Sequence, residues 1–251
     1  MNFDISQLLE QWDYQPGQVV VRKFKAKDGT EKIQLRVDLG LLQMNALGRP
    51  DGKRPLGHES LFEHFVGVLE KHRAAHAGSD DGFALKPEDC AKLQQEAIQY
   101  HHRYICLFQL EDFDAVVRDA ERNIEVFDFV SHFAETEEMS WSIEQFRPQL
   151  LMMHTRAKGA IALKESDYPA AMVAIEAGLD SIREFYRKHS RHDLMEQSGE
   201  LHSLEVWLEE IRSKRPLSER EKLENALHDA VQREDYEKAA QVRDALKNLK
   251  A

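Results

Sequence analysis

Histidines are the residues of this chain whose number and spacing first suggest chemistry. Twelve occur among 251 residues, and imidazole serves both as a metal ligand and as a general acid or base. His72 and His76 are spaced i, i+4 in a predicted helix, so they share one face. The residues between them lack the glutamate of a zinc-protease helix, and the adjacent His101 and His102 point to different faces. We predict no metal site and no cofactor, with these histidines solvated or packed between helices.

The segment 48–55 superficially resembles a phosphate-binding loop, because Lys53 follows Gly52 and Gly48 precedes them. The glycine spacing is one residue short of the usual motif, and Arg54 stands where a hydroxyl residue would bind magnesium. No apolar strand leads into the loop. We expect an exposed connection and no nucleotide site.

Nucleophilic and acid–base motifs are missing from the sequence. It has neither the Gly-x-Ser-x-Gly elbow nor the kinase signatures. Acidic clusters such as residues 135–138 arise without catalytic meaning in a chain with 45 Asp and Glu residues. Cys106 lies between Ile105 and Leu107, as expected for a buried, small apolar side chain. We therefore predict that the protein is not an enzyme.

The charge of the chain is acidic and uneven. The net charge is −11, which argues against a protein that coats nucleic acid, because such binding comes largely from phosphate neutralisation. Residues 19–54 hold nine basic and four acidic side chains, nine minus four giving +5, so the remainder carries −16. With 42% hydrophobic residues, the chain can form one large or two small domains.

Cysteine usage and hydropathy predict a cytoplasmic protein that does not enter a membrane. Cys90 and Cys106 are the two cysteines, they are far apart, and no Cys-x-x-Cys pair occurs. The first ten residues lack the basic and apolar regions of a signal peptide. No apolar run approaches the ~20 residues that span a bilayer.

A β-hairpin is predicted near the N-terminus, after a short helix over residues 3–12. An Asp28-Gly29 turn lies between two alternating segments, a strong hairpin signal. The second segment alternates Ile33, Leu35, Val37 and Leu39 with polar residues, so one face should be apolar and the other basic. The predicted basic face, a possible contact for nucleic acid or an acidic partner, comprises Arg22, Lys25, Lys32 and Arg36.

From residue 60 the apolar spacing becomes helical. The predicted helices cover residues 60–78, 87–110, 113–127, 149–163, the segment that starts at 168, and 191–212. Asp112-Phe113 and Asp167-Tyr168 mark two similar helix–helix turns, each with an acidic cap followed by an aromatic residue. These turns resemble those of tetratricopeptide (TPR) repeats, although the aspartates are 55 residues apart and not about 34.

The segment 217–251 forms a compact two-helix unit. Leu223, Ala226, Leu227, Ala230 and Val231 make one apolar stripe, and Arg233-Glu234-Asp235 interrupts it. Asp235 can cap the second helix, whose apolar side holds Tyr236, Ala239, Ala240, Val242, Leu246 and Leu249. Alanines at the inner positions allow two antiparallel helices to approach closely, and Tyr236 is expected to close the turn end.

The spacing of these residues closely resembles the UVR motif, the helical hairpin at the end of UvrB and inside UvrC. The resemblance covers about an eighth of the chain and implies a protein–protein contact element without catalytic residues. The motif also occurs in Clp chaperone ATPases and in zinc-binding adaptors. Those adaptors carry cysteine pairs ahead of the hairpin, which this chain lacks.

We therefore predict a mainly α protein: a TPR-like body of antiparallel helical hairpins, a small N-terminal β-hairpin and a C-terminal UVR-like hairpin. The predicted divisions are residues 1–57, 58–213 and 217–251, with Lys214-Arg215-Pro216 as linker.

The expected function is docking on a protein partner of unknown identity, or on a second copy of the chain. The expected contact residues are Leu223, Leu227, Val231, Tyr236, Ala240 and Leu246, with Arg243 and Asp244 at the rim. Two alternatives are a DNA-repair accessory factor, whose basic hairpin contacts nucleic acid, and an adaptor or modulator of a Clp-type protease or stress kinase.

Overall fold

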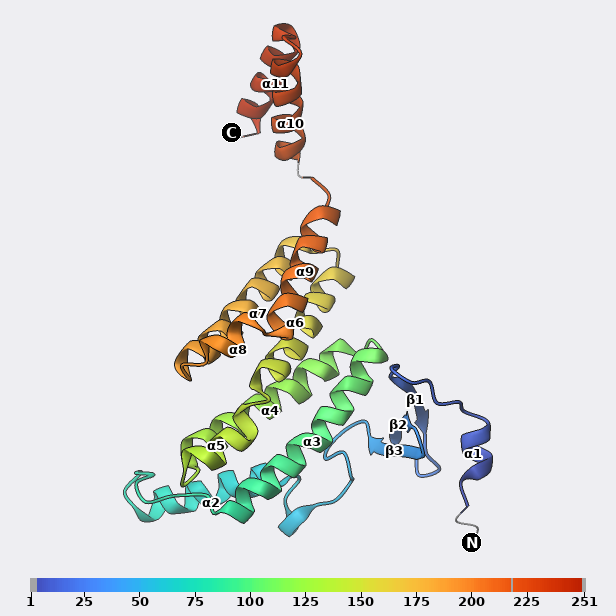
Figure 1. Ribbon diagram of the computed structural model, residues 1–251, viewed down its shortest axis with the longest axis vertical. Helices are drawn as coiled ribbons and strands as arrows, with labels where there is room; N and C mark the ends of the chain where they lie inside the picture. Colours follow the sequence, from blue (N-terminus) through green and yellow to red (C-terminus); the bar gives the residue numbers. More distant parts are fainter. Residues whose placement is uncertain (1–3, 218, 250–251) are drawn as a thin grey trace. The chain divides into compact units, whose positions relative to one another are not determined.

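The computed structural model describes residues 4–217 and 219–249. The chain divides into two compact units, Met1–Leu208 and Glu209–Ala251. Helices dominate both, and a small antiparallel sheet lies near the N-terminus (Figure 1), so the mainly α fold class is confirmed. Within the described ranges, no helix is long and apolar enough to cross a lipid bilayer.

The sheet has three strands, not two. The short helix α1 (Ser6–Glu10) precedes β1 (Val20–Lys25), β2 (Glu31–Val37) and β3 (Gly40–Asn45), which pair in the order β1-β2-β3. The predicted turn joins β1 to β2, and Gly29 there has φ +84°, which glycine adopts without steric cost. Placing Leu39 in the second strand is wrong: it lies in the turn before β3 and is 88% exposed. The alternation of apolar and polar residues continues through the turn residues Asp38 and Leu39. Neither is Gly, Pro or Asn, so the sequence gives no turn signal there.

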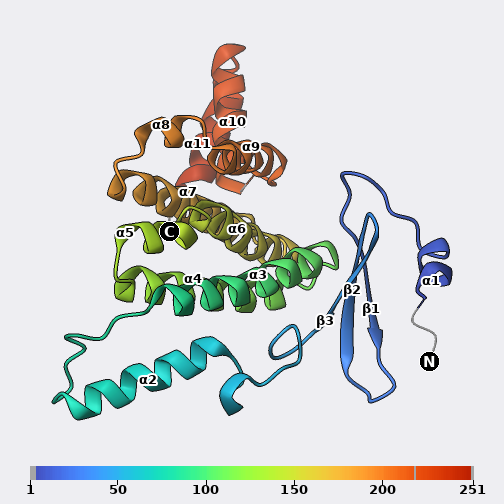
Figure 2. The ribbon, with the colours of Figure 1, turned by 60° about the horizontal axis from the view of Figure 1, so that its bottom comes forward.

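Helices follow the sheet through the rest of the chain. They are η1 (Pro55–Gly57), α2 (Leu61–Ala75), α3 (Pro87–Gln109), α4 (Phe113–Phe133), α5 (Glu137–Glu144), α6 (Arg147–Lys164), α7 (Tyr168–Lys188), α8 (His192–Glu196), α9 (Gly199–Lys214), α10 (Glu219–Gln232) and α11 (Tyr236–Asn248). Helices α3 and α4 form one antiparallel pair, and α6 and α7 form another (Figures 1 and 2). The predicted helical hairpins are thus confirmed, and α5 between the two pairs lengthens the interval between their turns.

Two helix assignments differ from the sequence prediction. Helix α5 was missed, although the hydroxyl of Thr136 caps it by accepting a hydrogen bond from the Met139 amide (3.3 Å). The single helix expected over residues 191–212 is divided into α8 and α9, because Ser198 starts a new helix by accepting from the Leu201 amide (3.3 Å). In both cases a hydroxyl cap sets the start of a helix.

One turn geometry recurs at the three helix–helix connections in which an aspartate follows the turn. In each, a non-glycine residue takes the left-handed conformation, and the next N–H donates to the carbonyl five residues back, as in the Schellman motif. The left-handed residues are Glu111, Ser166 and Glu234, with φ of 56°, 60° and 58°. The hydrogen bonds run from Asp112 N to Leu107 O (3.0 Å), Asp167 N to Ala162 O (2.9 Å) and Asp235 N to Ala230 O (2.9 Å). The aspartate that ends one helix therefore begins the next.

A buried ion pair joins α3 to α4. Arg103 and Asp119 are each 1% exposed, and Nε and Nη2 of Arg103 donate to the two Asp119 oxygens at 2.6 and 2.8 Å. The remaining nitrogen, Nη1, donates to the carbonyls of Asn45 (3.0 Å) and Gly48 (2.6 Å). The loop after β3, which superficially resembles a phosphate loop, is thereby fixed to α3.

Glu96 anchors a second group of charges beside this pair. Its side chain is fully buried and accepts from the Leu61 (2.8 Å) and Phe62 (3.2 Å) amides in the first turn of α2. Arg122 donates to the same carboxylate, and Arg49 Nε lies 3.3 Å from it. Glu96 therefore offsets the positive N-terminal end of α2 while two guanidinium groups offset its own charge.

Lys23 connects the sheet to α4. It lies on the same sheet face as its paired residue Ile33, which is completely buried. The Lys23 ammonium forms ion pairs with Glu31 (3.2 Å) and with Asp112 (3.4 Å), the residue that precedes α4. The two carboxylates raise the pKa of the Lys23 ammonium.

The left-handed turns give a stability prediction. Ser166→Gly should raise the free energy of unfolding by about 0.5–1 kcal/mol, because glycine adopts positive φ without the side-chain clash. Glu165→Gly is the matched control, since Glu165 has φ −84° and glycine there only adds unfolded-state entropy. Urea denaturation of both variants measures the difference. A Ser166→Gly variant no more stable than Glu165→Gly would contradict the assignment of the turn.

Candidate docking site

The C-terminal unit contains an antiparallel hairpin of α10 and α11. Asp235 caps α11 by accepting from the Lys238 amide (3.1 Å), and Glu234 supplies the left-handed residue of the turn. The seam between the helices is narrow: Ala230 is 3% and Ala239 is 9% exposed. Small side chains therefore allow the two helices to pack closely, as the sequence predicts.

The predicted contact residues fall into two groups. Leu223, Leu227 and Leu246 are half-buried along the hairpin. Val231 and Tyr236 are exposed large side chains, at 53% and 70%. The expectation that Tyr236 closes the turn end is wrong, because most of its surface stays exposed while the seam is filled by Ala230 and Ala239.

Three further predicted residues, Ala240, Arg243 and Asp244, are exposed on α11. The last two form an ion pair with each other at 3.4 Å. An exposed pair of this kind contributes little to stability, so both side chains are available at the rim of the apolar residues.

Charged side chains surround the apolar residues of the hairpin. Residues 219–249 contain eight acidic and six basic side chains, eight minus six giving a net charge of −2. Several pair within α10, including Arg220 with Glu224 (2.7 Å) and Lys222 with Glu219 (2.7 Å). The hairpin thus has a nearly balanced charge and a partly exposed apolar stripe.

The predicted basic face of the sheet is engaged mainly in internal contacts. Arg36 is 8% exposed and donates to the carbonyls of Trp12 (2.8 Å), Asp38 and Gly40 (both 3.0 Å), and Val37. Its guanidinium therefore fixes the β2–β3 turn and the segment after α1.

Arg22 and Lys32 also have internal partners. Arg22 Nε donates to Gln34 Oε1 (2.7 Å), and its guanidinium lies 4.2 Å from the centre of the Trp12 ring. Lys32 donates to the side chain of Asn45.

Lys25 corrects the prediction of a single basic face. It pairs with Glu31 in the β1–β2 register, on the sheet face opposite Arg22, Lys32 and Arg36. Because side chains alternate between the two faces along β1, Lys25 lies on the same face as residues 21 and 23. The four basic residues therefore do not form one surface.

The histidine pair that suggested metal chemistry is stacked. The rings of His72 and His76 lie 4.0 Å apart, and each has a nitrogen within hydrogen-bond distance of a backbone carbonyl, that of Asp81 (2.9 Å) and that of His72 (2.8 Å). In residues 4–217 and 219–249, no three His, Cys, Asp or Glu side chains are grouped to hold a metal ion.

His101 has a more unusual environment than the spaced pair. Its Nδ1 lies 2.7 Å from the Tyr104 hydroxyl, and burial together with the neighbouring His102 lowers its pKa to about 4. The sequence signal for this contact is only the i, i+3 spacing of the two residues, which is too common to single them out.

The geometry therefore defines a small helical hairpin with a partly exposed apolar stripe. Comparison with known protein families agrees: the model described as the UvrB/uvrC motif matches residues 218–251. The resemblance inferred from the hairpin residues is thus confirmed for this segment. No curated protein and no solved structure matches the chain.

Capping by Asp235 predicts a local effect on the hairpin. Asp235→Ala should lower the hydrogen-exchange protection of the Lys238 amide about fivefold, since the loss of a cap costs about 1 kcal/mol. Asp229→Ala removes an exposed carboxylate from α10 and should leave that amide unchanged. Exchange rates followed by NMR in the full chain check the prediction, and equal effects of the two variants would contradict it.

The depressed pKa of His101 predicts a dependence of stability on pH. Between pH 6.5 and 4 the unfolded chain binds a proton at His101 that the folded chain does not, so the free energy of unfolding falls as pH falls. His101→Phe should reduce the loss between pH 7.5 and 5 by roughly 1–2 kcal/mol. Urea denaturation at both pH values measures it, with the exposed His192→Phe as control. An unchanged pH dependence in His101→Phe would disprove the assignment.

Proposed function

We propose that this protein is a non-enzymatic interaction protein that docks on another protein through its C-terminal hairpin. The observation that carries the proposal is the exposure of Val231 and Tyr236, two large side chains beside a seam in which Ala230 and Ala239 are buried. Two helices alone bury little apolar surface, and most helical stability comes from packing an apolar face. A partner helix or hairpin that covers these side chains would supply the missing contact.

The match of residues 218–251 to the UvrB/uvrC motif supports the same proposal. The near balance of charge on the hairpin favours a protein surface over nucleic acid, for which phosphate contacts require an excess of cations. An aromatic residue such as Tyr236, ringed by charged side chains, is typical of an interface centre. A second copy of the hairpin is one possible partner, since a symmetric contact would bury the same residues on both copies.

The DNA-repair alternative has weaker support. It depends on the basic residues of the sheet, and Arg36, Arg22 and Lys32 already contact groups within the chain. The other alternative, an adaptor or modulator of a Clp-type protease or stress kinase, is supported by the motif match alone. The cytoplasmic location that we propose agrees with the two free and buried cysteines, Cys90 and Cys106.

The test compares variants of the exposed hairpin residues. Val231→Asp and Tyr236→Ala, alone and combined, should weaken partner binding or self-association by about tenfold or more, because interface centres contribute at least 2 kcal/mol per hot-spot residue. Affinity capture with the tagged full chain identifies the partner, and sedimentation of the purified proteins measures affinity and oligomeric state.

Gln241→Lys is the matched control, because Gln241 is an exposed polar residue of α11. It should leave binding within about twofold of the unsubstituted chain, since isolated exposed positions contribute little. Circular dichroism checks that all variants keep their helices. If the combined variant retains every partner and the same oligomeric state, the proposal fails.

A further inference from the structure

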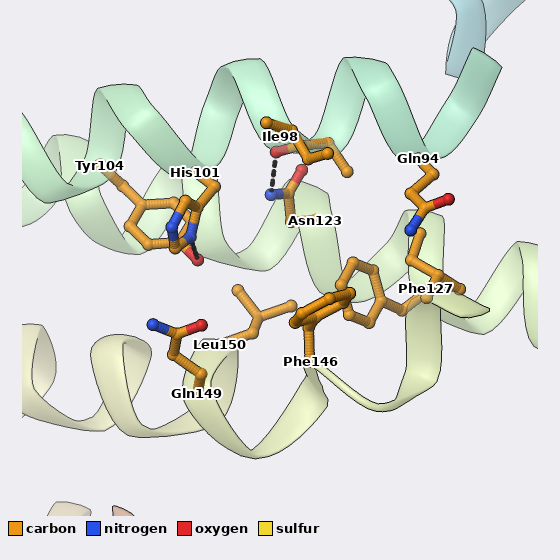
Figure 3. A pocket seen from close by; sticks show the side chains of 11 residues that line it. Gln94, Ile98, His101, Tyr104, Asn123, Phe127, Phe146, Gln149 and Leu150 are labelled. Carbon is orange, nitrogen blue, oxygen red and sulfur yellow. Dashed lines mark hydrogen bonds between the residues drawn. The ribbon is translucent and has the colours of Figure 1, made fainter. Parts of the chain in front are cut away.

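A pocket of about 230 Å³ opens in the helical body, between α3, α4 and the start of α6 (Figure 3). Its apolar lining comes mainly from Ile98, Phe127, Ile143, Phe146 and Leu150. The pocket lies within the first compact unit, so it is separate from the hairpin residues of the proposed docking site.

The walls and the mouth of the pocket differ in exposure. Phe127, Ile143 and Leu150 are 5%, 1% and 2% exposed, as expected of core residues. Ile98 and Phe146, in contrast, are 46% and 47% exposed. Large apolar side chains at the entrance of an apolar pocket favour the entry of an apolar group.

His101 and Tyr104 supply the polar edge of the pocket. Figure 3 shows their side chains together at one side. The Nδ1 of His101 lies 2.7 Å from the Tyr104 hydroxyl. We assign the hydroxyl as the donor to Nδ1, because the described residues offer it no other acceptor. The proton of the neutral imidazole then lies on Nε2, for which the described part of the chain provides no acceptor.

Asn123, a buried polar residue of the pocket lining, is hydrogen-bonded within the chain. The Asn123 amide donates to the Ala97 carbonyl (2.9 Å), and its oxygen accepts from Arg122 (3.0 Å). Gln94 and Gln149 also line the pocket: the Gln94 amide donates to the Ser142 carbonyl (3.0 Å), and Gln149 is exposed. The Nε2–H of His101 is the donor available to a ligand beside the buried Tyr104.

The pocket is electrically neutral. None of its lining residues is Asp, Glu, Lys or Arg, and burial keeps His101 uncharged by lowering its pKa to about 4. A charged ligand would lose its hydration without gaining an ion pair, which is costly. An uncharged ligand meets no such penalty.

We propose that this pocket binds a small uncharged molecule with an apolar body and one oxygen acceptor, such as a carbonyl, which accepts a hydrogen bond from Nε2–H of His101. The volume suits one ring with a short polar group, since it lies just below the usual range for ligand pockets. An apolar side chain from a partner protein would fill the same walls but leave the Nε2–H without an acceptor. A small molecule of this kind contacts the apolar walls and also accepts the hydrogen bond from the Nε2–H of His101.

Benzamide, toluene and benzoate are suitable probes, because they share one ring and differ in the acceptor and in charge. Each is titrated into the full chain, and binding is followed by chemical-shift changes of the backbone amides. Benzamide should saturate with shifts centred on α3, α4 and α6. Toluene should bind more weakly, and benzoate weakest of the three.

Two substitutions test the two parts of the site separately. His101→Phe removes the donor and should weaken benzamide about fivefold, the effect of one net hydrogen bond, without weakening toluene. Ile98→Trp, at an exposed position of the mouth, should obstruct both probes. Val173→Trp is the matched control, since Val173 is 65% exposed on α7 and does not line the pocket.

The outcomes decide the proposal. It is overturned if benzamide causes no saturable shifts near the pocket, or if His101→Phe weakens benzamide and toluene equally. Tighter binding of benzoate than of benzamide would also overturn it. An apolar peptide that binds the pocket when benzamide does not would assign the site to a protein partner.

Discussion

The buried contact between Arg103 and Asp119 is the constraint on which the fold of the first unit depends. A charged pair almost without exposure is stable only when every donor and acceptor has a partner. Asp119 accepts hydrogen bonds from two nitrogens of Arg103, and the remaining nitrogen donates to the carbonyls of Asn45, which ends β3, and of Gly48 in the loop after it. Two helices and the end of the sheet are therefore fixed by one side chain, whose charge would be costly to bury if any of them moved away.

The parts of the fold that local sequence determines could be predicted. A Schellman turn followed by an aspartate needs only a few neighbouring residues, and the helix pairs around Asp112, Asp167 and Asp235 were found from those residues. Strand β3 and helix α5 were missed because their starts depend on single local features, a two-residue turn and the Thr136 cap, that periodicity does not reveal. The partners of Arg103 and Glu96 could not be predicted either, since charged residues on amphipathic helices ordinarily face solvent.

The candidate docking site shows a similar limit. Spacing identified the hairpin and its apolar stripe, but not which members of the stripe the second helix covers. That division depends on the size of the seam residues: alanines bring the backbones together and leave Val231 and Tyr236 outside. On the sheet, the basic residues were found by type, whereas their partners depend on the register and on Trp12, which is distant in sequence.

Cys106 lies in the last turn of α3, three residues from Arg103, and is completely buried. Burial also raises the pKa of its thiol to about 12, so in the closed protein both access and ionisation oppose its reaction with an electrophile. The reactivity of this thiol therefore reports on opening of the surrounding structure. The rate at which a reagent such as iodoacetamide modifies it measures how often the helices around the Arg103–Asp119 pair separate, without any added label.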